Sequence, residues 1–221
     1  RAPNLAGLQA QLQIALNQRA KIVKKAENKP AAVGNILQQS FAGPNEKAII
    51  FCEDSEQVEH IREMLKEQNK IFNEFSSKVS SAQKLFALDS FKTTDASRFL
   101  LGINCLDEGL DVPESDKCII VSSTTNPRQF IQRRGRVLRK TKENPTKIAE
   151  VYDTIVIPNY RPPNRELTEE EEKEAERMAT LIQKEIDRVK QLSDSADNQQ
   201  DVIRELERWI AANRLGDYVN V

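Results

Sequence analysis

The strongest candidate for chemistry is a stretch of seven basic residues and no acidic residue between Arg128 and Lys142. Within it, Arg136 and Arg139 are three positions apart, so on a helix they share a face, and Gly135 lets the backbone approach a ligand closely. Two guanidinium groups on one face suit a phosphate, which they can bind through several donors. The alternative is a solvated basic helix end that stabilises the helix dipole.

A second candidate is LDEGLDVPESD, residues 106–116, which follows an apolar run ending at Ile103. Gly109 permits a tight turn there, and the backbone of Asp111 precedes Val112-Pro113, where proline limits the accessible conformations. These residues are suited to holding a ligand next to the end of a strand. A plain surface turn is the alternative interpretation of the same segment.

The elements that must position these residues are short apolar runs that alternate with amphipathic segments. Strands are predicted at 48–52, 71–75, 99–103, 118–121 and 150–157, and helices after Asp54, over 82–91 and from Asn126. This alternation is typical of the α/β class, with a parallel sheet covered by helices on both faces. Right-handed crossovers then place the carboxyl ends of the strands at one edge, where a ligand is expected.

Helical segments flank this region and carry opposite charge. We expect three parts: a helical N-terminal segment over residues 1–43, an α/β lobe over 44–160 and an acidic helical tail over 161–221, with net charges of +5, −1 and −5. In the first part, helices are predicted over 5–27 and from Pro30 to about Gln39. The near-neutral total therefore does not exclude a nucleic-acid partner, because a local basic stripe is sufficient for binding.

Composition excludes several other classes of protein. No apolar run approaches the 18 residues that a membrane span needs. The three cysteines are far apart and His60 is the single histidine, so the sequence predicts no metal site and favours buried thiols in a reducing compartment, cytoplasmic or, in a eukaryote, nuclear. The chain starts with Arg1, from which we expect a fragment of a longer protein.

Four segments, taken in order, resemble the motifs of the second RecA-like lobe, the C-terminal helicase lobe, of superfamily-two helicases and translocases, close to the XPB-like branch. KAIIFCEDSEQVEHI (47–61) resembles motif IV, and SSAQKLFALDSFK (80–92) the helix motif that follows it. INCLDEGLDVP (103–113) resembles motif V, and QRRGRVLR (132–139) motif VI. The resemblance covers about residues 44–160.

This resemblance implies a role for each matching residue. Arg136 and Arg139 would be arginine fingers that reach the γ-phosphate of ATP, and Gly109, Asp111 and Gln132 would bind or sense the nucleotide. The candidates for holding the nucleic-acid backbone, DNA being the expected partner, are Lys84, Asn104, Ser122, Ser123 and Thr124.

The sequence also lacks parts that such an enzyme needs. It contains no G-x-x-x-x-G-K-[ST] motif and no apolar strand ending in a DEAD-like box, and Asp107-Glu108 lies inside the motif V segment. ATP and Mg²⁺ would therefore be held mainly by a first RecA-like lobe of the same protein, and we expect this chain alone to be inactive. The alternatives are a non-catalytic RecA-like interaction module or the helicase part of a restriction-type helicase–nuclease.

Overall fold

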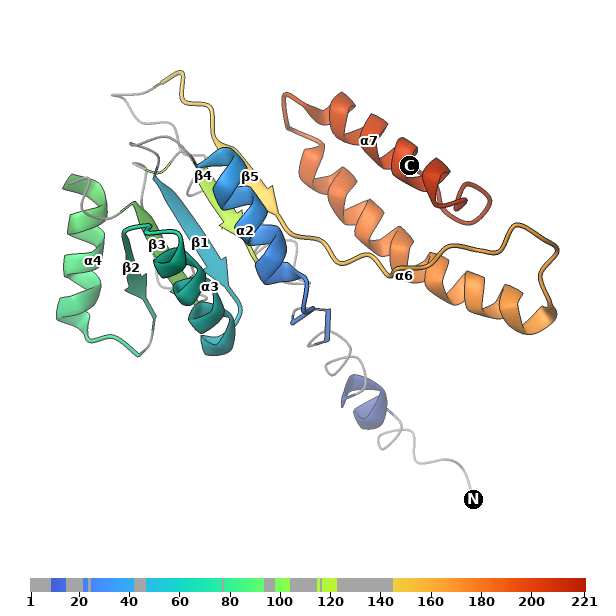
Figure 1. The fold of residues 1–221 in the computed structure, drawn as a ribbon, viewed down its shortest axis with the longest axis horizontal. Coiled ribbons are helices and arrows are strands. Elements are labelled where there is room, and N and C mark those ends of the chain that lie inside the picture. The colour runs from blue at the N-terminus through green and yellow to red at the C-terminus, as the bar shows by residue number, and fades with distance from the viewer. Residues whose placement is uncertain are drawn as a thin grey trace. The chain divides into compact units, whose positions relative to one another are not determined.

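The chain divides into two compact units, residues 1–154, called the lobe, and residues 155–221, called the C-terminal unit (Figure 1). The expected three-part division, with bounds after residues 43 and 160, stays a prediction. The computed structural model describes residues 9–14, 22–23, 25–41, 47–76, 78–93, 98–103, 115, 117–122 and 145–221.

The described residues of the lobe form a five-stranded, fully parallel sheet with the strand order β2-β3-β1-β4-β5. Its strands are β1 (Ala48–Cys52), β2 (Phe72–Phe75), β3 (Phe99–Ile103), β4 (Lys117–Ile120) and β5 (Glu150–Asp153). Every residue of β1 is buried, as its continuous apolar sequence predicts for a central parallel strand. The parallel α/β architecture expected from the sequence is confirmed.

Helices cover both faces of this sheet. On one face, the alternate β1 residues Ala48, Ile50 and Cys52 join a core cluster with helices α2 (Lys29–Ser40) and α3 (Ser55–Glu67). The side chains of the intervening β1 residues point to the opposite face. The Lys47 side chain points to this opposite face as well. Its Nζ donates a hydrogen bond of 2.7 Å to the carbonyl of Phe91, at the end of α4 (Ser81–Thr93). Helix α4, which packs on β2 and β3, therefore lies across the sheet from α3 (Figure 1).

The helix predicted over residues 5–27 agrees with its described residues except at its C-terminal end. Residues 9–14 and 22–23 are helical, whereas 25–28 form a turn before α2 begins at Lys29. Pro30 is the physical reason, because proline fits a helix only in its first turn and so requires a new helix to begin there. Helix α2 buries Val33 and Leu37 in the core cluster of the lobe.

Strand β5 is shorter than the predicted run 150–157. Its partner β4 ends at Ile120, which is paired with Asp153, and the Thr154 N–H makes a last bond to the Ile120 carbonyl. Beyond Thr154 the chain belongs to the C-terminal unit, where Ile157 packs against that unit's own core. An apolar run without a neighbouring strand to pair with does not extend the sheet.

The C-terminal unit contains the helices α6 (Glu169–Ser193) and α7 (Gln199–Ala212), in the tail that was expected to be helical. A reciprocal capping box between Thr168 and Glu171 starts α6. The two helices share a core that includes Ile182, Ile186 and Leu206, with Trp209 packed against it. None of the helices in the described part of the chain is long and apolar enough to span a membrane.

Candidate functional site

The carboxyl ends of all five strands meet at one edge of the sheet, which we call the carboxyl edge. The chain leaves the sheet at this edge towards the two candidate segments. The motif V segment follows Ile103 of β3, and the motif VI segment comes after β4. The carboxyl edge is therefore the part of the described lobe from which both segments start. Eight of those candidates lie outside the described residues: Asn104, Gly109, Asp111, Ser123, Thr124, Gln132, Arg136 and Arg139.

The exit of the chain from β4 is held by buried side chains from three other elements. The Val121 carbonyl accepts hydrogen bonds from Lys29 Nζ of α2 and Thr154 Oγ1 after β5, each at 2.7 Å. Gln57 Nε2 of α3 donates to Ser122 Oγ, also at 2.7 Å. All five residues are at least nine-tenths buried. We call Lys29, Gln57, Val121, Ser122 and Thr154 the β4 exit cluster.

Ser122 was predicted to contact nucleic acid, and the structure places it inside this cluster. Its side chain is fully buried, with the hydroxyl directed at Gln57 instead of the surface. Gln57 in turn accepts from the Glu53 N–H through Oε1 at 3.0 Å, so the amide joins β1, α3 and β4. A nucleic-acid contact by Ser122 stays a prediction, whereas its bond to Gln57 shows that it orders the carboxyl edge.

The first turn of α3, also at the carboxyl edge, carries a charged cap. Asp54 Oδ1 accepts from the Gln57 N–H at 3.0 Å, as the sequence predicts for a capping aspartate. Lys25 pairs with Asp54 at 3.0 Å and also with Glu56. Burial raises the pKa of Asp54, but the Gln57 N–H and the Lys25 ammonium lower it by more, so the pKa is below its usual value.

Lys84, the other described candidate for nucleic-acid binding, lies in the first turns of α4. Its ammonium group is 5.2 Å from the centre of the Phe75 ring, at the end of β2. Ser80 begins the helix by accepting from the Gln83 N–H through Oγ at 3.3 Å, while Gln83 Oε1 accepts from the Ser80 N–H at 2.9 Å. Lys84 thus sits at the carboxyl edge, and its role in binding nucleic acid stays a prediction.

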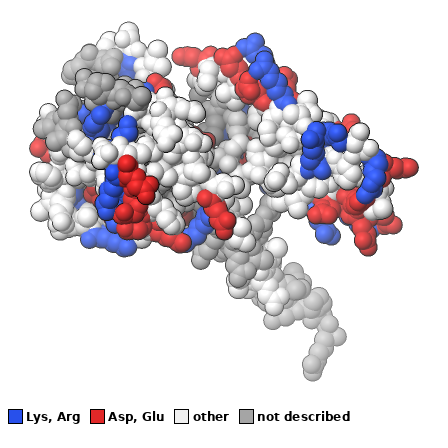
Figure 2. All heavy atoms as spheres, in the orientation of Figure 1, with Lys and Arg blue, Asp and Glu red and all other residues white. Residues whose placement is uncertain are grey.

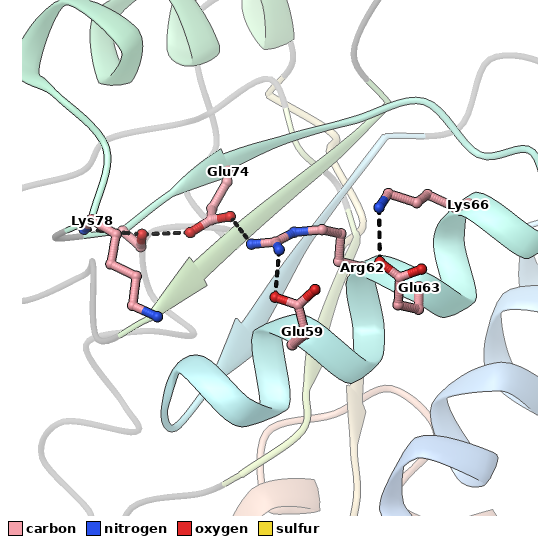
Figure 3. Close-up of polar contacts among 7 residues, drawn as sticks. Glu59, Arg62, Glu63, Lys66, Glu74 and Lys78 are labelled. Carbon is pink, nitrogen blue, oxygen red and sulfur yellow. Dashed lines mark hydrogen bonds and ion pairs between the residues drawn. The ribbon is translucent and has the colours of Figure 1, made fainter.

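A charged network that was not evident in the sequence joins α3 to the loop between β2 and α4 (Figure 3). Arg62 of α3 contacts Glu74 of β2 at 2.5 Å and Glu59 of its own helix at 2.5 Å. Ser76 Oγ donates to Glu74 at 2.6 Å and accepts from the Lys78 N–H at 3.3 Å. The spacing of Glu59 and Arg62 indicates a helix pair, but only the fold brings Glu74 to them.

Burial raises the pKa of Glu74, but the hydrogen bonds from Ser76 and Arg62 lower it by more, so its pKa is below the usual value of 4.5. The charged Glu74 therefore stabilises the folded lobe.

Figure 2 shows that acidic and basic side chains alternate over the described part of the lobe on this face, instead of forming a surface of one sign. In the C-terminal unit, the first turn of α6 holds four consecutive glutamates.

The predicted buried thiols are confirmed for the two cysteines that the structure describes. Cys52 and Cys118 are buried and form no disulfide among the described residues, and Cys105 lies outside the described residues. Burial, with a contribution from the charge of Asp153, raises the pKa of the Cys118 thiol to about 12. Among the described residues, no group of three or more His, Cys, Asp or Glu side chains could hold a metal ion.

A parallel sheet with helices on both faces, from whose carboxyl edge the motif segments start, defines the class of RecA-like lobes. Residues 28–141, just over half of the chain, match the family of the helicase conserved C-terminal domain. The chain belongs to that family. The expected identity as the C-terminal lobe of a superfamily-two helicase is thereby confirmed.

Two curated relatives are similar over about half of the chain. The DNA 3'-5' translocase XPB2 of Sulfurisphaera tokodaii is 30% identical over 129 residues, 58% of this chain and 26% of the relative. The DEAD-box ATP-dependent DNA helicase Fancm of Drosophila melanogaster is 31% identical over 118 residues, 48% of this chain and 8% of the relative. The chain thus spans about a quarter or less of the length of these proteins.

A solved structure shares the fold. The C-terminal part of the Fun30 ATPase domain superposes with a TM-score of 0.51 at 16% sequence identity, covering 59% of this chain and 41% of that one. This likeness concerns the fold alone. The XPB-like resemblance expected from the sequence agrees with the similarity to the translocase XPB2.

Proposed function

We propose that this chain is the C-terminal lobe of an ATP-dependent DNA helicase or translocase, and that it completes an ATPase site in the cleft against a first RecA-like lobe. The observation that carries the proposal is the family match over residues 28–141, which includes both predicted motif segments. It is supported by the parallel sheet, from whose carboxyl edge those segments depart.

In this proposal, Arg136 and Arg139 act as arginine fingers on the γ-phosphate. Their guanidinium groups stabilise the charge that develops during phosphoryl transfer, an effect that is worth a factor of about 10³–10⁵ in rate. Gly109, Asp111 and Gln132 line the nucleotide side of the cleft. ATP supplies the free energy of translocation and, with Mg²⁺, is held mainly by the first lobe.

The nucleic-acid side of the lobe would be formed by Lys84 on α4 together with Asn104, Ser123 and Thr124. Lys84 lies at the carboxyl edge beside Phe75, at the end of β2, the strand next to β3. DNA is the proposed substrate because both relatives described above are named for acting on DNA. A lobe of mixed surface charge is expected to bind a strand through a few defined contacts and not through a broad basic surface.

The test is the rate of DNA-stimulated ATP hydrolysis by the full-length protein that contains both lobes. Arg136→Ala should lower kcat by about 10³ or more. The matched control is Arg208→Ala, which removes an exposed arginine that is paired with Glu205 on α7 and should leave the rate unchanged. An Arg136→Ala protein that hydrolyses ATP at the normal rate would refute the finger assignment.

A further inference from the structure

Lys29 is a lysine whose side chain is buried at the amino end of α2. Lys29 is 4% exposed, and its Nζ donates a hydrogen bond of 2.7 Å to the Val121 carbonyl, 92 positions away along the chain. Lysines are rarely buried, because removing an ammonium group from water is costly unless strong hydrogen bonds compensate. The charge is therefore placed at one particular carbonyl, the first one beyond β4.

The Val121 carbonyl also accepts a hydrogen bond from the chain just after β5, the strand next to β4. Thr154 Oγ1 donates to it at 2.7 Å, and the Thr154 N–H bonds the preceding Ile120 carbonyl at 3.0 Å. Gln57 holds the next residue, Ser122, through its hydroxyl. Side chains from α2, α3 and the end of β5 thus converge on the last two described residues before the segment 123–144.

A second lysine ties the same helix to the opposite end of β4. Lys117 Nζ donates 3.3 Å to the Ser40 carbonyl, lies 5.1 Å from the Phe41 ring centre and is 3.4 Å from Glu150. Helix α2 is therefore attached to β4 at both ends, by Lys29 at the carboxyl edge and by Lys117 at the opposite edge. Both lysines hold the helix on the sheet, but only Lys29 holds the exit towards the motif VI segment.

We propose that Lys29 and Thr154 are positioning residues for the arginine fingers, an inference that rests on the proposed function. The helix predicted to carry Gln132–Arg139 begins at Asn126, four residues after Ser122. In this predicted helix, a displacement of the first residues would carry through to Gln132–Arg139. Since a misplacement of about 1 Å can cost a hundredfold in rate, the position of the β4 exit controls how well the fingers reach the phosphate.

The experiment compares Lys29→Met, Thr154→Val and the control Lys117→Met in the full-length protein. Lys29→Met should lower kcat of DNA-stimulated ATP hydrolysis by about ten- to a hundredfold, with KM for ATP changed less than about twofold, because the fingers act in the transition state. Thr154→Val should show a smaller loss of the same kind. Lys117→Met should keep kcat within about twofold of wild type, even where its thermal unfolding midpoint shifts as much as that of Lys29→Met. Equal losses of kcat in Lys29→Met and Lys117→Met would overturn the inference.

A double-mutant cycle with Arg136→Ala separates positioning from a general structural defect. If Lys29 acts through the fingers, Lys29→Met should lower kcat by a smaller factor in the Arg136→Ala background than in wild type, because only the Arg139 finger is left to misplace. An undiminished further loss there would overturn the inference. Thr154→Val, which removes one hydroxyl from a side chain of similar volume, carries the same test should Lys29→Met fail to fold.

The outcomes also distinguish this inference from the proposed function. If Arg136→Ala keeps the wild-type rate, the finger assignment itself fails. If Arg136→Ala is inactive while Lys29→Met and Thr154→Val turn over normally, the proposed function stands and only the positioning role is wrong.

Discussion

The Glu74→Ala substitution tests whether the network between α3 and β2 is a stabilising feature of the lobe. The side chains of Glu74 and Arg62 are only 15% and 27% exposed, and Glu74 accepts from both Arg62 and Ser76. A hydrogen bond to a charged group contributes about 1.5–3 kcal/mol when it is shielded from water. Arg62 keeps its contact with Glu59 after the substitution, which limits the cost of leaving it buried. We therefore expect a loss of about 2 kcal/mol in the free energy of unfolding.

The matched control is Glu63→Ala on the same helix. Glu63 pairs with Lys66 at 2.7 Å, but both side chains are more than half exposed (Figure 3). Exposed pairs of this kind contribute about 0–1 kcal/mol, and helix pairs about 0.3–0.5 kcal/mol. In thermal unfolding followed by far-ultraviolet circular dichroism, Glu74→Ala should lower the midpoint by about 4–8 °C and Glu63→Ala by less than about 2 °C.

The effect of Glu74→Ala should also depend on pH. The pKa of Glu74 is lowered in the folded lobe, so its contribution is fully present above the unfolded value of 4.5 and is lost as the pH falls through the folded pKa. The difference between wild type and variant should therefore shrink below about pH 4.5. Equal destabilisation by Glu74→Ala and Glu63→Ala at pH 7, or a Glu74→Ala effect that persists undiminished in acid, would refute the reasoning.

Three further expectations can be measured on the chain as it stands. The isolated chain should show negligible ATPase activity and weak DNA binding that falls steeply with added salt, and robust turnover would contradict the assignment of ATP to a first lobe. Asp54→Ala should destabilise the lobe by about 1 kcal/mol through loss of the α3 cap, as measured by urea unfolding, whereas Asp54→Asn should retain most of the stability. Because burial raises its pKa to about 12, Cys118 should resist alkylation at pH 8 in the folded chain and react in urea, as read by residue-level mass spectrometry.

The helices and strands of the lobe are largely predictable because their signals are local. The apolar runs at 48–52 and 99–103 give β1 and β3 with the predicted bounds, and Asp54 gives the cap of α3. Helix α4 was found, but its buried face was less predictable. Apolar residues occur around the whole helix, and the structure buries Phe91 while leaving Leu85 and Phe86 about two-thirds exposed.

The carboxyl edge was predictable only in part, because its contacts join residues far apart in sequence. The order of the motifs indicates which segments meet at the edge, since parallel strands bring their carboxyl ends together. The bond from Lys29 to the Val121 carbonyl has no sequence signal, because a lysine near the start of a helix is normally solvated. Ser122 illustrates the same limit. Its position in the sequence beside two other hydroxyl residues does not predict the hydrogen bond that it accepts from Gln57 of α3.

The strand order has a consequence for synthesis on the ribosome. The first strand to be made, β1, is the central strand of the finished sheet, and its two neighbours β3 and β4 are made about 50 and 70 residues later. A nascent chain that ends before Lys117 has one side of β1 without its partner and exposes an apolar strand edge that can pair with another chain. Truncations between β3 and β4 are therefore expected to aggregate, and the lobe should be produced with at least residues 28–154 in a single chain.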